Sequence, residues 1–282
     1  MNIQSAYWEM KQKLSAVYAT REAAHIADMV MEKILSLSKT ERLSYKNDLL
    51  NAGQQMQWND FLQQLAAGKP VQYVLEEAWF CNLKFYVSEH VLIPRPETEE
   101  LVEWILNVSK NRALNILDIG TGSGCIAIAL KKRNDLLKVH AIDISEAALQ
   151  VAKQNAMNNN APVHFLQMDI LDENQWNMLP EFDIIVSNPP YIPQREADSM
   201  NNNVVGYEPH PALFVANDNP FIFYDAIAKF GRKKLSENGN LFFEINESLG
   251  IETQAVIKKY AYKEVTIKKD MQNKDRMIRA VL

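Results

Sequence analysis

The first seventy residues carry apolar side chains at helical spacing. Ile26, Val30 and Ile34 follow one another in steps of four, which is the period of one helix face. No alternation of apolar and polar residues, the pattern of a half-buried strand, interrupts this stretch. The sequence therefore predicts a domain of several short helices over residues 1–70, which ends where glycine and proline break the pattern.

The pattern changes over residues 71–95. Phe80, Leu83 and Phe85 are apolar residues that favour strands, and an asparagine between them suits a turn. We interpret residues 71–95 as a β-hairpin that links two domains. Two prolines end this segment, and a helix with one apolar face is predicted over residues 97–108.

Strands and helices alternate from residue 113 to the C-terminus. Near-continuous apolar strands separated by helices indicate a largely parallel sheet that is covered on both faces. We therefore predict an α/β domain over residues 96–282. Its seven expected strands are Leu114–Ile119, Val139–Ile142, Val163–Leu166, Ile184–Ser187, Leu241–Ile245, Val265–Lys268 and Met277–Leu282.

Composition narrows the class of protein. Hydrophobic residues make up 47% of the chain, enough for a sizeable core, and the formal net charge of -5 gives little reason to expect a phosphate-gripping surface. The two cysteines lie outside any Cys/His cluster, so we expect neither a disulfide scaffold nor a metal site. No signal-peptide pattern or membrane-length apolar run is found. We expect a cytoplasmic monomer that binds neither membranes nor nucleic acid directly.

A strand, a glycine-rich turn and a helix follow one another near residue 120. The turn consists of Gly120, Thr121, Gly122, Ser123 and Gly124. Glycines let the backbone approach a ligand closely and adopt positive φ. Asp143 closes the next expected strand, where a carboxylate can accept hydrogen bonds from ribose hydroxyls. This pattern predicts the binding site of a nucleoside-containing cofactor.

The spacing distinguishes two such cofactors. An NAD-binding turn follows the pattern GxGxxG and places a pyrophosphate at a helix N-terminus, but here Cys125 occupies the third glycine position. Asp118 stands just before the turn, where a carboxylate repels a pyrophosphate and suits the cationic end of S-adenosylmethionine. We therefore predict S-adenosylmethionine. Asp169, after the third strand, is placed to meet the adenine amino group.

A stiff loop follows the fourth expected strand. Asn188 is followed by Pro189, Pro190 and Tyr191, and two consecutive prolines prevent the strand from continuing. In an open α/β sheet, ligands bind at the carboxyl ends of the strands, at the point where the strand order reverses. We therefore expect this loop to border the same crevice as the glycine turn.

The residue types in this loop suit the methylation of a planar nitrogen. An amide nitrogen is a poor nucleophile because its lone pair is delocalised, so it needs two acceptors that fix both N–H groups. The side-chain oxygen of Asn188 and the carbonyl of Pro189 can be those acceptors, and Tyr191 offers a face for stacking. Catalysis would then rest mainly on positioning, an effect of up to about 7–11 kcal/mol in model reactions.

Several segments together resemble the release factor glutamine methyltransferases. They are Pro70–Tyr73 (PVQY), Leu92–Glu99 (LIPRPETE), Leu117–Gly124 (LDIGTGSG) and Ser187–Ile192 (SNPPYI). The resemblance covers the chain from about residue 10 to its end. It implies a class I S-adenosylmethionine-dependent methyltransferase fold, which is Rossmann-like with a seven-stranded, mostly parallel sheet. It also implies methylation of the glutamine side-chain nitrogen in the Gly-Gly-Gln loop of peptide chain release factors.

The resemblance also assigns residues. The small N-terminal helical domain would help to dock the release factor, and Asn188, Pro189, Pro190 and Tyr191 would bind the glutamine, with Asn188, Pro189 and Tyr191 as the catalytic set. The expected cofactor residues are Asp118, Gly120, Thr121, Gly122, Ser123, Gly124, Asp143, Asp169, Ile170 and Asn188. Residues 217–220 and 246–248 depart from the family pattern. For Arg95, two readings stay open, namely contact with the cofactor, the protein substrate or Glu97, and a surface salt bridge.

Other functions compete with this one. An amino-methyltransferase acting on adenine in nucleic acid shares the Asn-Pro-Pro-Tyr chemistry, but it needs a basic channel and a base-flipping pocket. A non-catalytic binding module could keep the fold, although an intact loop at Asn188 argues against it. A Rossmann dehydrogenase lacks its third glycine here.

Overall fold

The structure, a computed structural model, describes residues 1–110 and 112–282. Contacts within the chain divide it into two compact units. The first contains residues 1–77 together with 201–207, and the second contains residues 78–200 and 208–282. The boundary therefore follows Glu77 instead of residue 70, and the first unit includes a distant segment that the sequence pattern did not indicate.

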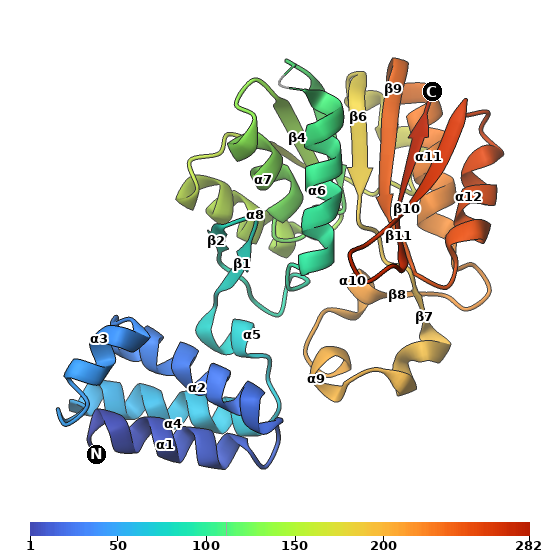
Figure 1. Ribbon diagram of the computed structural model, residues 1–282. Helices are drawn as coiled ribbons and strands as arrows, with labels where there is room; N and C mark the ends of the chain where they lie inside the picture. The colour runs from blue at the N-terminus through green and yellow to red at the C-terminus, as the bar shows by residue number, and fades with distance from the viewer. Residues whose placement is uncertain (111) are drawn as a thin grey trace. The chain divides into compact units, whose positions relative to one another are not determined.

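The first unit is helical, as predicted. Its helices are α1 (Ile3–Leu14), α2 (Thr20–Leu35), α3 (Lys39–Ser44), α4 (Ala52–Ala66), α5 (Val71–Leu75) and α9 (Asn202–Val205). Helices α1, α2 and α4 contact one another around a core that includes Met10, Val30 and Leu65 (Figure 1, blue). Trp58 lies in this core and donates its indole N–H to the carbonyl oxygen of Ala6 over 3.2 Å. Apolar burial along the three helices thus holds this unit together.

The linking segment is only partly a hairpin. Strands β1 (Ala78–Phe80) and β2 (Leu83–Phe85) pair antiparallel, which confirms a hairpin over residues 78–85. Cys81 and Asn82 form its turn with φ of 50° and 60°. The earlier part of the predicted linker is wrong as strand, because the chain forms helix α5 there. Both strands belong to the second unit.

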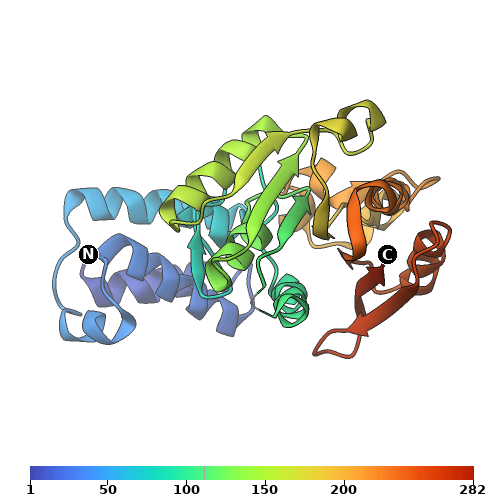
Figure 2. The same cartoon turned by 90° about the horizontal axis from the view of Figure 1, so that it is seen from above.

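The second unit contains a seven-stranded sheet, which confirms the predicted α/β class. Its spatial order is β10-β11-β9-β6-β3-β4-β5, and β11 runs in the direction opposite to that of the other strands (Figures 1 and 2). The strands are β3 (Asn115–Ile119), β4 (Lys138–Asp143), β5 (His164–Gln167), β6 (Phe182–Ser187), β9 (Leu235–Glu244), β10 (Glu264–Lys269) and β11 (Asp275–Val281). Each coincides with a predicted strand to within a few residues, apart from the earlier start of β9.

Helices cover both faces of this sheet, as Figure 2 shows. The remaining elements are α6 (Pro96–Ser109), α7 (Cys125–Arg133), α8 (Glu146–Asn158), the 3-10 helices η1 (Glu173–Met178) and η2 (Gln194–Ser199), β7 (Ile192–Pro193), α10 (His210–Leu213), β8 (Phe214–Val215), α11 (Ile222–Lys234) and α12 (Gly250–Lys258). On one face, Leu117, Ile185 and Phe243 are buried together with α11 and α12. On the other, α7 contacts β3, β4, α6 and α8. Burial on both faces explains the continuous apolar strands.

The order of the strands reverses beside β3. The chain runs outward from β3 to β4 and β5, then returns to place β6 on the other side of β3. Ile119 and Ser187 are register partners, and the Ser187 hydroxyl donates to the Ile119 carbonyl over 2.7 Å. The loops that follow these two strands therefore start side by side, at the place where open α/β sheets bind ligands.

Candidate active site

The glycine turn after β3 has the backbone conformation that the sequence predicts. Gly120, Gly122 and Gly124 have φ of 72°, 54° and 80°, a region that residues with a Cβ rarely adopt. An added Cβ at Gly120 or Gly122 would meet no atom within 4 Å, whereas at Gly124 it would lie 3.0 Å from Ile128 Cδ1 and 3.2 Å from Ala152 Cβ. The first two glycines therefore serve the conformation of the turn, and Gly124 also permits α7 to approach α8.

Asp143 ties this turn to the end of β4. Its Oδ2 accepts the Gly122 N–H and its Oδ1 accepts the Ser145 N–H, both over 2.9 Å. Burial raises the pKa of Asp143, although these backbone hydrogen bonds oppose the shift. The carboxylate has lone pairs left for further donors, such as ribose hydroxyls.

A cavity of about 360 Å³ opens between the turn and the loop at Asn188. Of the predicted site residues, it is lined by Gly120, Thr121, Gly122, Ser123, Asp143, Asp169, Ile170, Asn188, Pro189 and Pro190. Apolar side chains, including Ile119, Ile142 and Phe223, form much of the remaining wall. A mainly apolar cavity with a few polar groups is typical of a small-molecule site.

Three predicted residues do not line this cavity. Asp118 is fully buried, and its Oδ2 accepts the Thr121 hydroxyl over 2.6 Å. Burial raises the pKa of Asp118 to about 7, although the hydrogen bond from Thr121 opposes the shift. Gly124 packs against helix residues, and Tyr191 donates its hydroxyl to Glu244 Oε1 over 3.1 Å. These three residues thus support the walls of the site from behind.

Four of the five backbone N–H groups of the turn already have acceptors within the protein. Gly120 and Thr121 both donate to the Ile142 carbonyl, Gly122 donates to Asp143, and Gly124 donates to the Thr121 carbonyl. A pyrophosphate site needs such N–H groups free to face the anion. The turn is therefore poorly suited to a pyrophosphate, and Asp143, which lines the cavity, suits a nucleoside without phosphate groups.

The loop at Asn188 is held by residues that the sequence patterns did not assign. Asn188 Nδ2 donates to Thr98 Oγ1 over 3.4 Å, and Thr98 donates to Glu244 Oε2 over 2.6 Å. Thr98 and Glu244 are each only 2% exposed. Thr98 lies within the segment LIPRPETE, and Glu244 is a charged residue at the end of a buried strand, which was the available signal for a role.

Arg95 forms a salt bridge with the buried carboxylate of Glu208, one of the alternatives that the sequence left open. Its Nη2 donates to Glu208 Oε1 over 2.5 Å, and Glu208 Oε2 also accepts the Ile93 N–H over 3.3 Å. Glu208 is 3% exposed, and Arg95 lines the cavity. The ion pair therefore fixes the segment around Arg95 to the segment that follows residue 207.

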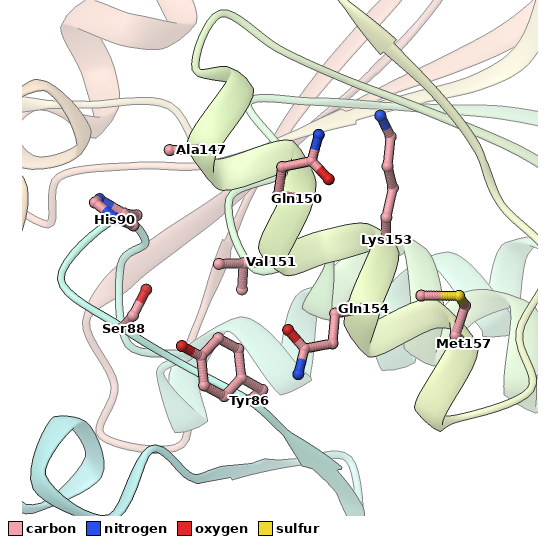
Figure 3. Close-up of a pocket in the computed structure, with 9 residues that line it drawn as sticks. All are labelled: Tyr86, Ser88, His90, Ala147, Gln150, Val151, Lys153, Gln154 and Met157. Carbon is pink, nitrogen blue, oxygen red and sulfur yellow. The ribbon is translucent and has the colours of Figure 1, made fainter.

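Figure 3 shows a second hollow, of about 620 Å³, between the segment at Tyr86–His90 and helix α8. Gln150, Lys153 and Gln154 project from the helix beside it. Although it is larger, it lies open to solvent and contains none of the predicted site residues. We therefore place the chemistry in the smaller cavity.

Two further findings concern metal binding and membrane crossing. Within residues 1–110 and 112–282, no group of three or more His, Cys, Asp or Glu side chains is arranged to hold a metal ion. No helix in the same part of the chain is both long and apolar enough to cross a membrane.

Comparisons with known proteins agree with this fold. Residues 98–205 match the model of the methyltransferase small domain. A methyltransferase from Pyrococcus furiosus superposes with a TM-score of 0.51 at 18% identity, over 71% of this chain and 88% of its own. The Thermus thermophilus 16S rRNA N2 G1207 methyltransferase, solved with S-adenosylmethionine and guanosine, gives 0.51 at 16% identity over 73% of this chain and 49% of its own. Fold and site define a class I methyltransferase whose cofactor is S-adenosylmethionine.

Relatives with higher sequence identity show which family of methyltransferases the chain belongs to. Residues 5–75 match the PrmC N-terminal domain. The release factor glutamine methyltransferase of Flavobacterium psychrophilum is 43% identical over 99% of both chains, and that of Bacteroides thetaiotaomicron is 38% identical over 99% of both. The chain belongs to the release factor glutamine methyltransferase family.

Proposed function

We propose that this protein methylates the side-chain nitrogen of the glutamine in the Gly-Gly-Gln loop of peptide chain release factors. The observation that carries the proposal is the shared cavity. Asn188 and Pro189 line it together with the glycine turn and Asp143, so the amide-binding loop and the cofactor residues face one space.

The cofactor site has complementary walls. Asp143 would accept hydrogen bonds from ribose hydroxyls, while Ile142 and Ile170 would pack against the adenine, with Asp169 near its amino group. When bound, S-adenosylmethionine supplies a methyl group that its sulfonium makes electrophilic, so a strong base is not needed.

The loop at Asn188 orients the substrate amide. Since Asn188 Nδ2 faces Thr98, its Oδ1 is left to accept one N–H of the glutamine amide, and the Pro189 carbonyl accepts the other. The two acceptors would fix both N–H groups and aim the nitrogen at the methyl group, whose bond to sulfur would break as the nitrogen–carbon bond formed. The nitrogen then loses one proton to water. Such positioning can contribute about 7–11 kcal/mol in model reactions.

The test uses the full chain, methyl-labelled S-adenosylmethionine and a bacterial release factor. We expect label on the glutamine of the Gly-Gly-Gln loop, located by mass spectrometry, and none on a release factor with alanine at that position. Asn188→Ala should lose most turnover and keep its affinity for S-adenosylmethionine, whereas Asn174→Ala, at an exposed asparagine of η1, should behave as wild type. Label in duplex DNA alone would support the adenine methyltransferase, and label in neither would support the binding module.

We also infer that the helical unit docks the release factor and that the protein acts as a cytoplasmic monomer without direct contact to nucleic acid. Trp8 and Leu49, which are 53% and 75% exposed on this unit, support a docking role because large apolar side chains at a surface favour partner contact. Trp8→Ala should raise the KM for the release factor and leave the cofactor affinity unchanged. Light scattering with size exclusion tests the oligomeric state.

A further inference from the structure

A chain of hydrogen bonds connects the side-chain amide of Asn188, just after β6, to the buried carboxylate of Glu244 on β9. Asn188 Nδ2 lies 3.4 Å from Thr98 Oγ1, and Thr98 Oγ1 lies 2.6 Å from Glu244 Oε2. The residues come from three separate elements, namely the end of β6, the first turn of α6 and the end of β9. The hydrogen bonds therefore form only when all three elements are folded together.

The direction of these hydrogen bonds follows from chemistry. A carboxylate can only accept, so the single hydroxyl proton of Thr98 is donated to Glu244. The Thr98 oxygen then has only lone pairs to offer Asn188, and only the NH2 end of that amide can meet them. The carbonyl end of Asn188 must therefore point the other way. The hydrogen-bond network thus assigns the two ends of the amide.

We propose that Glu244 and Thr98 are positioning residues that fix which end of the Asn188 amide meets the substrate. This inference rests on the proposed function, in which the Asn188 oxygen must accept an N–H from the glutamine. Were the amide reversed, its NH2 group would face the NH2 group of the substrate, and neither could accept. Glu244 acts through Thr98 and Asn188 and touches no reacting atom.

The same carboxylate holds the other end of the loop. Tyr191 donates its hydroxyl to Glu244 Oε1 over 3.1 Å, and the Tyr224 hydroxyl donates to the Glu244 backbone carbonyl over 3.0 Å. Burial raises the pKa of Glu244, while the hydrogen bonds from Thr98 and Tyr191 and the charge of Arg276 favour its ionised form. One buried side chain therefore orders both Asn188 and Tyr191.

The main test compares turnover with cofactor binding. Thr98→Val removes the hydroxyl at nearly constant volume and should lower kcat about 10- to 100-fold, the range expected when a reacting group is misplaced. The Kd for S-adenosylmethionine should stay within about twofold. Thr98→Ser restores the hydroxyl and should recover most of the turnover. A kcat for Thr98→Val within about twofold of wild type would overturn the proposal, as would an equal loss in Thr98→Ser.

A matched control and a double variant separate positioning from packing. Thr253 is also fully buried, but its hydroxyl donates to the Leu249 carbonyl within α12, so Thr253→Val should leave kcat unchanged.

Glu244→Gln can present either amide end to Thr98 and should also lower kcat. Because both changes break one chain, the loss in Thr98→Val with Glu244→Gln should be smaller than the product of the single losses. A simple product would contradict coupling through Thr98.

A second readout needs no substrate. In nitrogen-15 labelled protein, the side-chain NH2 signals of Asn188, assigned by their loss in Asn188→Ala, should show a nuclear Overhauser contact to the Thr98 methyl group. Glu244→Gln should weaken or abolish that contact. If the wild type failed to methylate release factors while the contact behaved as expected, the proposed function would fail and the positioning role would stand. An unchanged contact in Glu244→Gln would reject the positioning role.

Discussion

The Gly122 N–H donates to Asp143 Oδ2 over 2.9 Å and so joins the turn after β3 to the end of β4. Asp143 also accepts the Ser145 N–H, which holds the start of the segment before α8. One carboxylate thus shapes the turn and also lines the cavity in which we propose that the cofactor binds. Changes at Asp143 should therefore affect cofactor binding more than any later step.

Asp143→Ala should weaken S-adenosylmethionine binding. A hydrogen bond to a charged group contributes about 1.5–3 kcal/mol, so the loss of the ribose contact alone corresponds to a Kd roughly 10- to 100-fold higher. Isothermal titration calorimetry measures this change. Asp135→Ala, at an exposed acid before β4, is the control and should bind as wild type. Equal binding by both variants would remove Asp143 from the cofactor site.

Gly124→Ala should destabilise the second unit. The φ of 80° and the 3.0 Å approach to Ile128 Cδ1 both oppose a side chain at this position. Overpacking of this kind costs about 1–3 kcal/mol, which we expect to see as a lower midpoint in thermal unfolding. Gly53→Ala in α4 is the comparison, because its added Cβ would lie 3.4 Å from the nearest atom outside the helix backbone. That variant should unfold at or above the wild-type temperature.

Asp28 should make stability depend on pH in the acid range. Burial opposes its ionisation, but hydrogen bonds from Lys39 and Arg42 outweigh burial and lower the pKa of Asp28 below its ordinary value of 3.8. Because the folded-state pKa is depressed, the stabilisation is present above about pH 4 and is lost as the pH falls through the folded value.

The Asp28→Asn variant tests this dependence. It should unfold at a lower temperature than wild type near pH 7, and the difference should shrink as the pH is taken below about 4. Asp60→Asn, at an exposed acid of α4, should show a much smaller difference at pH 7. If the difference in unfolding temperature between Asp28→Asn and wild type grew as the pH fell, a depressed folded-state pKa of Asp28 would be contradicted.

Arg95 and Glu208 should be coupled energetically. Removing Arg95 leaves a buried carboxylate without its cation, which costs about 3–5 kcal/mol in buried pairs, although the partial exposure of Arg95 should reduce this loss. Arg95→Met should therefore unfold more readily than the double variant Arg95→Met with Glu208→Gln. Chemical unfolding of both single variants and the double variant measures the coupling. Additive losses would mean that the pair is not a unit.

Local patterns predicted most of the fold. The strands of the sheet are short apolar runs between helices, so their positions could be read from composition and spacing, as at Ile184–Ser187. Helix α5 was missed because a helix of five residues shows too little of its period to be told from a strand. The early start of β9 was missed because its polar residues Ser236–Asn240 resemble a loop.

Most residues that line the candidate site could be predicted from the sequence, because the expected chemistry requires particular residue types there. Glycines, strand-end acids and the two prolines after Asn188 each have a local reason to be where they are. Thr98 and Glu244 have no such local reason, because their roles arise from a contact between residues that lie 146 positions apart in the chain. Likewise, no local pattern distinguishes Asp118, buried beneath the turn, from Asp143, which lines the cavity. Only tertiary contacts separate these cases.

Residues 201–207 belong to the helical unit although the chain reaches them long after leaving it, and Tyr207 donates its hydroxyl to the Ala67 carbonyl over 3.0 Å. The helical unit is consequently not a cassette that recombination could exchange with a single crossover near Glu77. A helical unit moved to another protein by such an exchange would lack residues 201–207, which lie within the sequence of the methyltransferase unit. Inheritance of the two units as a pair, with covariation between residues near 67 and 207, is the evolutionary signature that this arrangement should leave.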